Sequence, residues 1–184
     1  MLWPALVAHW GSTASERAGG FPCEGLIEAP DHTMFRAVDV EAPQSVTFRW
    51  LCQLRAAPYS YDKLDNLGRR SPQTLTPGLD DLQPGQRVQT IFKLVEFEPG
   101  RSMTMLSEGR VFGRVACTYR SDPADEGRSR IVVKLIASYP GLPHGPLVRL
   151  AGPPGDLVMM RRQLLNLKEL AERTAADGGF EPNA

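Results

Sequence analysis

The stretch DLVMMRRQLLNLKELAERT, residues 156–174, is predicted to decide the fold. Its apolar side chains recur every three or four positions, the spacing of one face of an α-helix; they are Leu157, Met160, Leu164, Leu167 and Ala171. Asp156 is a good N-cap, so we expect the helix to begin there and to end near Thr174. At about 1.5 Å per residue, such a helix is long enough to cross a whole sheet.

The sheet for this helix to cover is predicted upstream. We expect a first strand over residues 34–40, and four more that end before a Pro- and Gly-rich loop at 140–155; they span 87–97, 101–106, 110–120 and 130–139. Residues 110–120 and 130–139 alternate apolar and polar, so each has one buried face. Short turns between these strands predict antiparallel neighbours.

Two helices are predicted between the first strand and the others. The first opens after Glu41 with Pro43 at its first helical position and ends by Ala57, because Pro58 disfavours helical geometry in the residue before it. The second is shorter, over residues 60–67, with Gly68 as its C-terminal cap. Residues 71–85 are rich in Pro, Gly and Asp and predict a long loop.

Composition narrows the function classes. A chain of 184 residues with a formal net charge of zero predicts one domain, and it does not suggest a surface that neutralises nucleic-acid phosphates. Neither the three cysteines nor the three histidines have metal-ligand spacing, so we expect no metal site. The cysteines are odd in number and far apart, so we expect free thiols and a reducing, cytoplasmic location. We expect no membrane span, because no apolar run approaches about 18 residues, and no secretory signal.

The candidate site is the stretch WLCQLRAAPYSYDKLDNLGRRSP, residues 50–72. It combines aromatic and charged groups more densely than any other stretch of the chain. Its aromatic, charged and amide side chains are Tyr59, Tyr61, Asp62, Asp65, Asn66, Arg69 and Arg70. Aromatic rings with polar tips suit the wall of a ligand pocket. The alternatives are that the tyrosines anchor a short helix, and that the aspartates cap it or pair with the arginines.

Several segments resemble uncharacterised bacterial, mostly actinobacterial, members of the SRPBCC superfamily, also called START-like or polyketide cyclase/dehydrase-like. They are HWGSTASERAGGFPCE (9–24), VEAPQSVTFRWLCQL (40–54), APYSYDKLDNLGRRSP (57–72), LQPGQRV (82–88) and VMMRRQLLNLKELAE (158–172). The resemblance implies an α+β helix-grip fold, in which a curved antiparallel sheet wraps a long C-terminal helix and two short helices follow the first strand. We therefore expect an N-terminal arm (1–33) packed on a domain (34–176), and a flexible tail (177–184).

The resemblance also implies a cavity between the sheet and the last helix. Residues predicted to line it are Trp50, Tyr59, Tyr61, Asp62, Asn66, Arg69, Phe92, Tyr119, Met159 and Met160. The first hypothesis is a protein that binds a hydrophobic or amphipathic small molecule there without a cofactor. The second is a cyclase- or dehydratase-like enzyme in which Tyr61 or Asp65 moves protons. The third is an interaction protein, with a possible homodimer and no small ligand.

Overall fold

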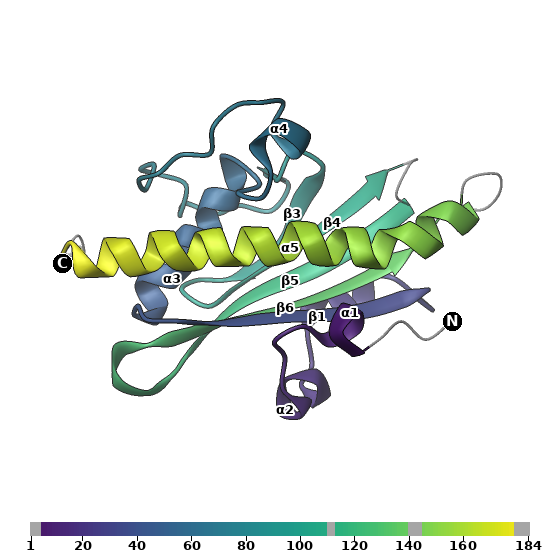
Figure 1. The fold of residues 1–184 in the computed structure, drawn as a ribbon, viewed down its shortest axis with the longest axis horizontal. Coiled ribbons are helices and arrows are strands. Elements are labelled where there is room, and N and C mark those ends of the chain that lie inside the picture. The colour runs from purple at the N-terminus through teal and green to yellow at the C-terminus, as the bar shows by residue number, and fades with distance from the viewer. Residues whose placement is uncertain (1–4, 110–112, 140–144, 179–184) are drawn as a thin grey trace.

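A six-stranded antiparallel sheet, in the order β1-β6-β5-β4-β3-β2, organises this computed structural model (Figure 1). The structure describes residues 5–109, 113–139 and 145–178. The strands are β1 (His32–Val40), β2 (Arg87–Val88), β3 (Phe92–Glu98), β4 (Ser102–Gly109), β5 (Gly113–Pro123) and β6 (Ser129–Ser138). The helices are α1 (Ala5–His9), α2 (Ala14–Ala18), α3 (Gln44–Cys52), α4 (Asp62–Asp65) and α5 (Gly145–Ala176), with 3-10 turns at Pro22–Leu26, Gln53–Arg55 and Asp125–Gly127.

Helix α5 runs along the concave face of the sheet, and α3 packs against one end of it (Figure 1). The helix presents Leu164, Leu167 and Ala171 to the sheet, and all three are fully buried. These contacts confirm the amphipathic stripe predicted from its spacing. The curved sheet, the long C-terminal helix and the short helices after β1 are the predicted helix-grip arrangement.

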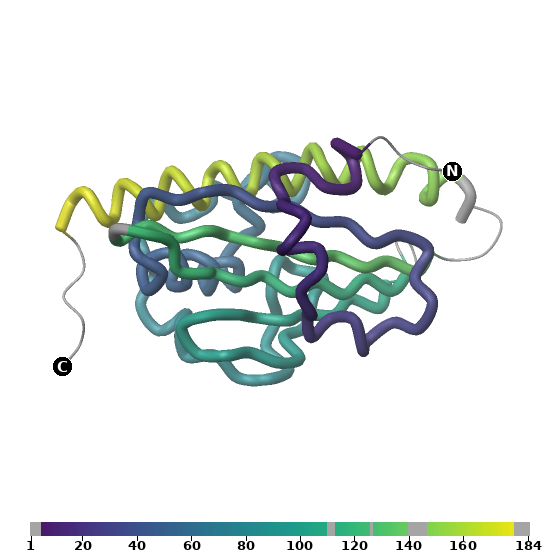
Figure 2. Tube along the Cα trace, turned by 90° about the horizontal axis from the view of Figure 1, so that it is seen from below, coloured from purple at the N-terminus to yellow at the C-terminus, as the bar shows by residue number. Residues whose placement is uncertain are grey.

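The convex face of the sheet is also covered. Residues 5–31 cross the edge formed by β1 and continue over the opposite face of the sheet (Figure 2). Phe21 is buried there and meets Phe35 edge to face, with ring centroids 5.8 Å apart. The Cys23 N–H donates to Thr118 Oγ1 over 3.1 Å. The outward side chains of the central strands therefore pack in a second, smaller core rather than facing water.

The predicted start of the C-terminal helix was wrong. Helix α5 begins at Gly145, so Asp156 lies within it rather than at its N-cap, and Pro153 and Pro154 lie inside the helix. A proline ring accepts helical φ but costs about 3 kcal/mol through lost hydrogen bonding. This part of the helix contacts the sheet, where Asp156 pairs with Arg36 of β1. Of the predicted loop at 140–155, residues 140–144 lie outside the described residues.

The predicted long strand at 87–97 was also wrong, because it is two strands. Gln89 and Thr90 adopt φ of 47° and 69°, in the left-handed region, and turn the chain between β2 and β3. Long-range contacts hold this turn: the Gln89 N–H donates to the Leu54 carbonyl, and its side chain donates to the Tyr119 hydroxyl. Neither contact can be read from the local alternation of residues.

The two short helices are shorter than predicted. Helix α3 begins at Gln44, with Pro43 as the residue before it, and gives way to the 3-10 turn at Gln53. Helix α4 keeps only Asp62–Asp65 of the predicted 60–67. Gly68 has φ of 77°, as expected of a helix-ending glycine.

Candidate functional site

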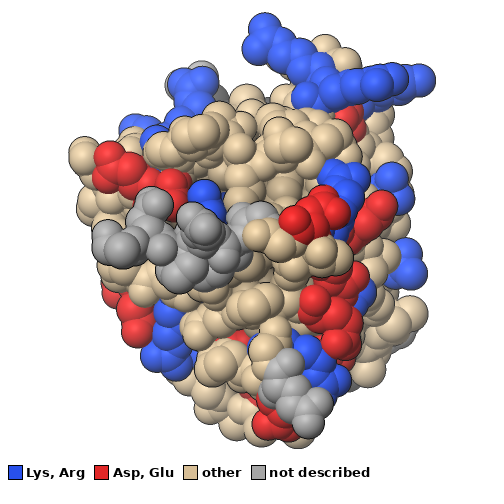
Figure 3. All heavy atoms as spheres, turned by 90° about the vertical axis from the view of Figure 1, so that its left-hand side faces the viewer, with Lys and Arg blue, Asp and Glu red and all other residues tan. Residues whose placement is uncertain are grey.

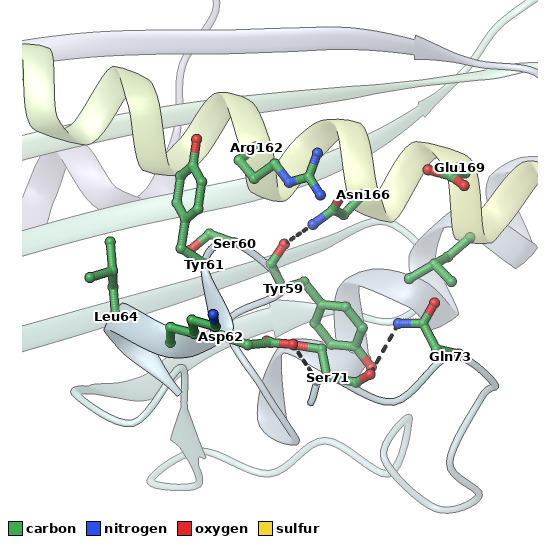
Figure 4. A pocket seen from close by; sticks show the side chains of 12 residues that line it. Tyr59, Ser60, Tyr61, Asp62, Leu64, Ser71, Gln73, Arg162, Asn166 and Glu169 are labelled. Atoms are coloured by element: carbon green, nitrogen blue, oxygen red, sulfur yellow. Dashed lines mark hydrogen bonds between the residues drawn. The ribbon is translucent and has the colours of Figure 1, made fainter. Parts of the chain in front are cut away.

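A pocket of about 710 Å³ lies between α5 and the segment that carries α4 (Figure 4). Its walls come from the α4 segment, from the loop that follows it and from one side of α5; they are Tyr59, Ser60, Tyr61, Asp62, Lys63, Leu64, Ser71, Gln73, Arg162, Asn166, Glu169 and Leu170. The residues are far apart in sequence, so only the packing of the α4 segment on α5 brings them together.

One polar stripe of α5 forms a wall of the pocket. Arg162, Asn166 and Glu169 are spaced by four and three positions, which places them on one side of the helix (Figure 4). The stripe presents a cation at one end, an amide in the middle and an anion at the other end. Leu170 adds an apolar surface beside it and is buried. This wall can therefore orient a ligand that has polar and apolar parts.

The chain entering the pocket is clamped to α5 by two amide side chains. Gln163 Nε2 donates to the Pro58 carbonyl over 2.6 Å, and Asn166 Nδ2 donates to the Tyr59 carbonyl over 2.8 Å. Tyr59 has φ of 57°, a strained value for a bulky residue. The clamp and the edge-to-face contact of the Tyr59 ring with Trp50, at 6.0 Å, hold this conformation in place.

The Tyr59 hydroxyl is buried and has no hydrogen-bond partner among the described residues. Burial raises the pKa of this phenol, and the charge of Asp62 raises it further. The hydroxyl therefore stays protonated at neutral pH and is a free donor. In Figure 4 the Tyr59 ring points towards the side of the pocket formed by Ser71 and Gln73.

The two aspartates of the α4 segment are engaged in local hydrogen bonds. Asp62 accepts from the Ser71 N–H over 2.9 Å and from the Ser71 hydroxyl over 2.6 Å. Asp65 accepts a hydrogen bond from the Ser60 hydroxyl, and its other carboxylate oxygen is buried without a partner among the described residues. Asp62 therefore ties the loop after α4 to the helix, and neither helix capping nor pairing with the arginines, the two alternatives for these aspartates, is seen among the described residues.

A second group of polar side chains lies between the sheet and α5. The Tyr119 hydroxyl donates to Gln163 Oε1 over 2.6 Å and accepts from Gln89 Nε2 over 3.0 Å. Burial raises the pKa of Tyr119 well above its ordinary value. Nearby, Arg36 is fully buried and pairs with Asp156 over 2.6 Å. These groups tie the sheet to α5.

The structure brings three of the ten predicted pocket residues together. Tyr59, Tyr61 and Asp62 line the pocket. The other seven do not line it: Trp50, Phe92, Tyr119 and Met160 are buried in the core, Asn66 and Arg69 form the turn after α4, and Met159 is half-buried on α5. Asp65, a candidate proton-transfer residue, also lies outside the lining. The pocket opens beside α5, and the predicted cavity between sheet and helix stays a prediction.

Sequence reasoning missed most of the α5 wall. The pattern of this helix predicts that Arg161 and Arg162 flank its buried stripe with stems over apolar surface, and that one of them could reach an acidic ligand group. Asn166 and Glu169 carried no prediction as pocket residues, although their spacing from Arg162 is a detectable polar stripe. The pattern could not show which element faces that stripe.

Metal clusters and membrane-spanning helices are both absent from the described residues. No group of three or more His, Cys, Asp or Glu side chains there could hold a metal ion. No helix in the described ranges is both long and apolar enough to cross a bilayer.

Comparisons with known proteins identify similar folds. No family model and no curated protein matches the chain. A Thermobifida fusca protein solved by NMR is 15% identical over 77% of this chain and 93% of its own, with a TM-score of 0.52. TTHA0849 from Thermus thermophilus is 14% identical over 78% and 99%, with a TM-score of 0.51.

A third similar structure is the di-domain ARO/CYC BexL from the BE-7585A biosynthetic pathway. It is 12% identical over 78% of this chain and 47% of its own, with a TM-score of 0.51. Such low identities establish the fold and nothing finer. The chain therefore has the helix-grip fold, with a pocket between its α4 segment and its long C-terminal helix.

Proposed function

We propose that the protein binds an amphipathic small molecule with an acidic group in the pocket between the α4 segment and α5. The observation that carries this proposal is the composition of the pocket walls. Apolar surface comes from Leu64, Leu170 and the tyrosines, and polar groups line the α5 side. Affinity would come mainly from burying ligand surface, at roughly 25 cal/mol per Å².

Arg162 is the residue proposed to select the acidic group. It is exposed on α5, lines the pocket and forms no ion pair within the described part of the chain. A guanidinium can hold a carboxylate through two parallel hydrogen bonds. Glu169, seven positions along α5, would repel the acidic group and so set the ligand's direction. Asn166 already donates to Tyr59 and serves to fix the wall.

The test compares two neighbouring arginines by calorimetry with dodecanoate as ligand and dodecanol as its uncharged counterpart. Arg162→Met keeps the apolar stem and removes the charge. Arg161→Met is the matched control, because Arg161 stacks on Trp10, with its guanidinium 5.6 Å from the ring centroid, and does not line the pocket. We expect Arg162→Met to weaken dodecanoate binding about tenfold or more while Arg161→Met leaves it unchanged. Equal effects of the two variants, or no binding to the wild type, would contradict the proposal.

The finer family assignment is also a proposal. The segments that resemble SRPBCC members, together with the fold shared with BexL, support membership of that superfamily and kinship with its actinobacterial members.

The cellular location is proposed from the cysteines. All three are free and buried, which supports a reducing, cytoplasmic location.

A second candidate function is a cyclase-like enzyme, and the fold shared with an ARO/CYC protein favours it. Tyr61, which is exposed and lines the pocket, would then transfer protons, and Asp65 would act through its hydrogen bond from Ser60. Tyr61→Phe and Asp65→Asn should then abolish a turnover found by substrate screening. Unchanged rates would remove both residues from the mechanism.

A further inference from the structure

The turn that ends α4 carries exposed leucines next to cations. We define the α4 tip as Lys63, Leu64, Leu67, Arg69 and Arg70. Leu64 is 74% exposed and Leu67 is 87% exposed, and the three cations are exposed as well. Single exposed leucines are common in proteins, but a pair surrounded by three cations forms a surface with a definite chemistry.

The cations of the tip are not held in ion pairs among the described residues. Lys63, Arg69 and Arg70 form no ion pair in the described part of the chain. Asp62 and Asp65 of the same segment accept hydrogen bonds from Ser71 and Ser60 instead, and with three cations against these two carboxylates the segment keeps a net positive charge. In Figure 3, Lys and Arg side chains stand clear of the molecule along its upper edge, the side on which α4 lies in Figure 1. The tip therefore presents positive charge to its surroundings.

The backbone holds Leu67 in its outward position at a cost. Leu67 has φ of 53°, a conformation that Gly or Asn adopts far more readily. Hydrogen bonds fix the turn: the Gly68 N–H donates to the Asp62 carbonyl over 2.7 Å, and Asn66 Nδ2 donates to the Arg69 carbonyl over 2.7 Å. The turn gains these hydrogen bonds, but the almost fully exposed Leu67 side chain adds no packing to the fold, which points to a contact with a partner surface.

We propose that the α4 tip docks on the surface of an anionic lipid bilayer. Leu64 and Leu67 would enter the boundary between headgroups and acyl chains, and the three cations would meet anionic headgroups. Lys63 and Leu64 also line the pocket, so a docked tip would bring its entrance to the lipid surface. This proposal goes beyond ligand binding and does not depend on it, because Leu67, Arg69 and Arg70 lie outside the pocket lining.

A second copy of the chain is a poorer occupant for this surface. Two tips meeting across a two-fold axis would bring like charges together, three from each copy. An anionic bilayer offers negative headgroups to the three cations of the tip and an apolar interior to its two leucines.

Co-sedimentation with vesicles tests the proposal. The probes are vesicles of phosphatidylcholine alone and of phosphatidylcholine with one quarter phosphatidylglycerol, at low and high salt. We expect wild type to bind the anionic vesicles at least tenfold more tightly, and to lose that preference at high salt because the charges are screened. Arg69→Gln/Arg70→Gln should weaken binding about 25-fold, from roughly fivefold per cation near an anionic surface.

Leucine variants separate insertion from charge. Leu67→Ser should weaken vesicle binding about tenfold, whereas Leu147→Ser, at a leucine of α5 that is 68% exposed, is the control and should have no effect. Both variants should keep the wild-type thermal midpoint and dodecanoate affinity, which separates this test from that of the pocket. Equal binding to both vesicle types would overturn the proposal. So would a dimer in sedimentation velocity that Leu67→Ser dissociates, because the occupant would then be a second copy.

Discussion

Replacing Asp156 with Asn should destabilise the protein strongly, because Asp156 is the partner of a buried cation. Arg36 is fully buried on the concave side of β1, and its Nη2 lies 2.6 Å from Asp156 Oδ2. Removing one partner of a buried ion pair costs about 3–5 kcal/mol, since the other charge is left in the interior. The amide keeps the shape of the carboxylate, so the loss is one of charge.

The expected cost lies at the lower end of that range. Burial raises the pKa of Asp156 even though Arg36 opposes the shift, so part of the cost of burying the carboxylate disappears with its charge. Arg36 also keeps its hydrogen bond to the Phe35 carbonyl, at 2.8 Å. About 3 kcal/mol corresponds to a fall of about 6–12 °C in the thermal midpoint of a protein of this size.

Thermal and urea unfolding, followed by circular dichroism, measure the effect. Asp80→Asn is the matched control, because Asp80 is 47% exposed in a loose pair with Arg49, and it should change the free energy of unfolding by less than about 0.5 kcal/mol. Arg36→Met combined with Asp156→Asn should restore most of the stability, because no buried charge remains. If Asp156 were the N-cap that the sequence predicts, Asn would replace it at almost no cost. A midpoint within about 1 °C of wild type would therefore refute the buried-pair reasoning.

Two further predictions concern the arm and the interior. Burial opposes ionisation of Glu16, but hydrogen bonds from Arg130 and Thr13 outweigh it and hold its pKa below the ordinary 4.5. Above that pH the ionised carboxylate stabilises the fold, and below it the unfolded chain takes up the proton first. The gap in urea midpoint between wild type and Glu16→Gln should therefore be full at pH 7 and shrink as the pH falls below 4.5; a constant gap would argue against the ion pair. Tyr119→Phe leaves the buried Gln163 Oε1 without its donor and should cost about 1–3 kcal/mol in urea unfolding, and a neutral result would mean that water or another donor replaces the hydroxyl.

The sequence alone determined the features that depend on local spacing. Residues three and four apart share a helix face, so the positions of Leu164, Leu167 and Ala171 predict the buried side of α5 without reference to the sheet. Short turns likewise predict the antiparallel pairing of the strands that follow one another from β3 to β6. The density of aromatic and charged groups around Tyr59 and Asp62 marked part of one pocket wall.

Tertiary structure decided everything that depends on contacts between distant residues. Helix α5 continues past two prolines to Asp156, which pairs with Arg36 of β1, and the Gln89–Tyr119 hydrogen bond supports a turn inside a continuous strand pattern. The same holds for the pocket, whose opposite wall exists because Asn166 binds the Tyr59 carbonyl. Apart from proline in a helix, local propensities differ by about 1 kcal/mol or less per residue, so a few long-range contacts suffice to override them.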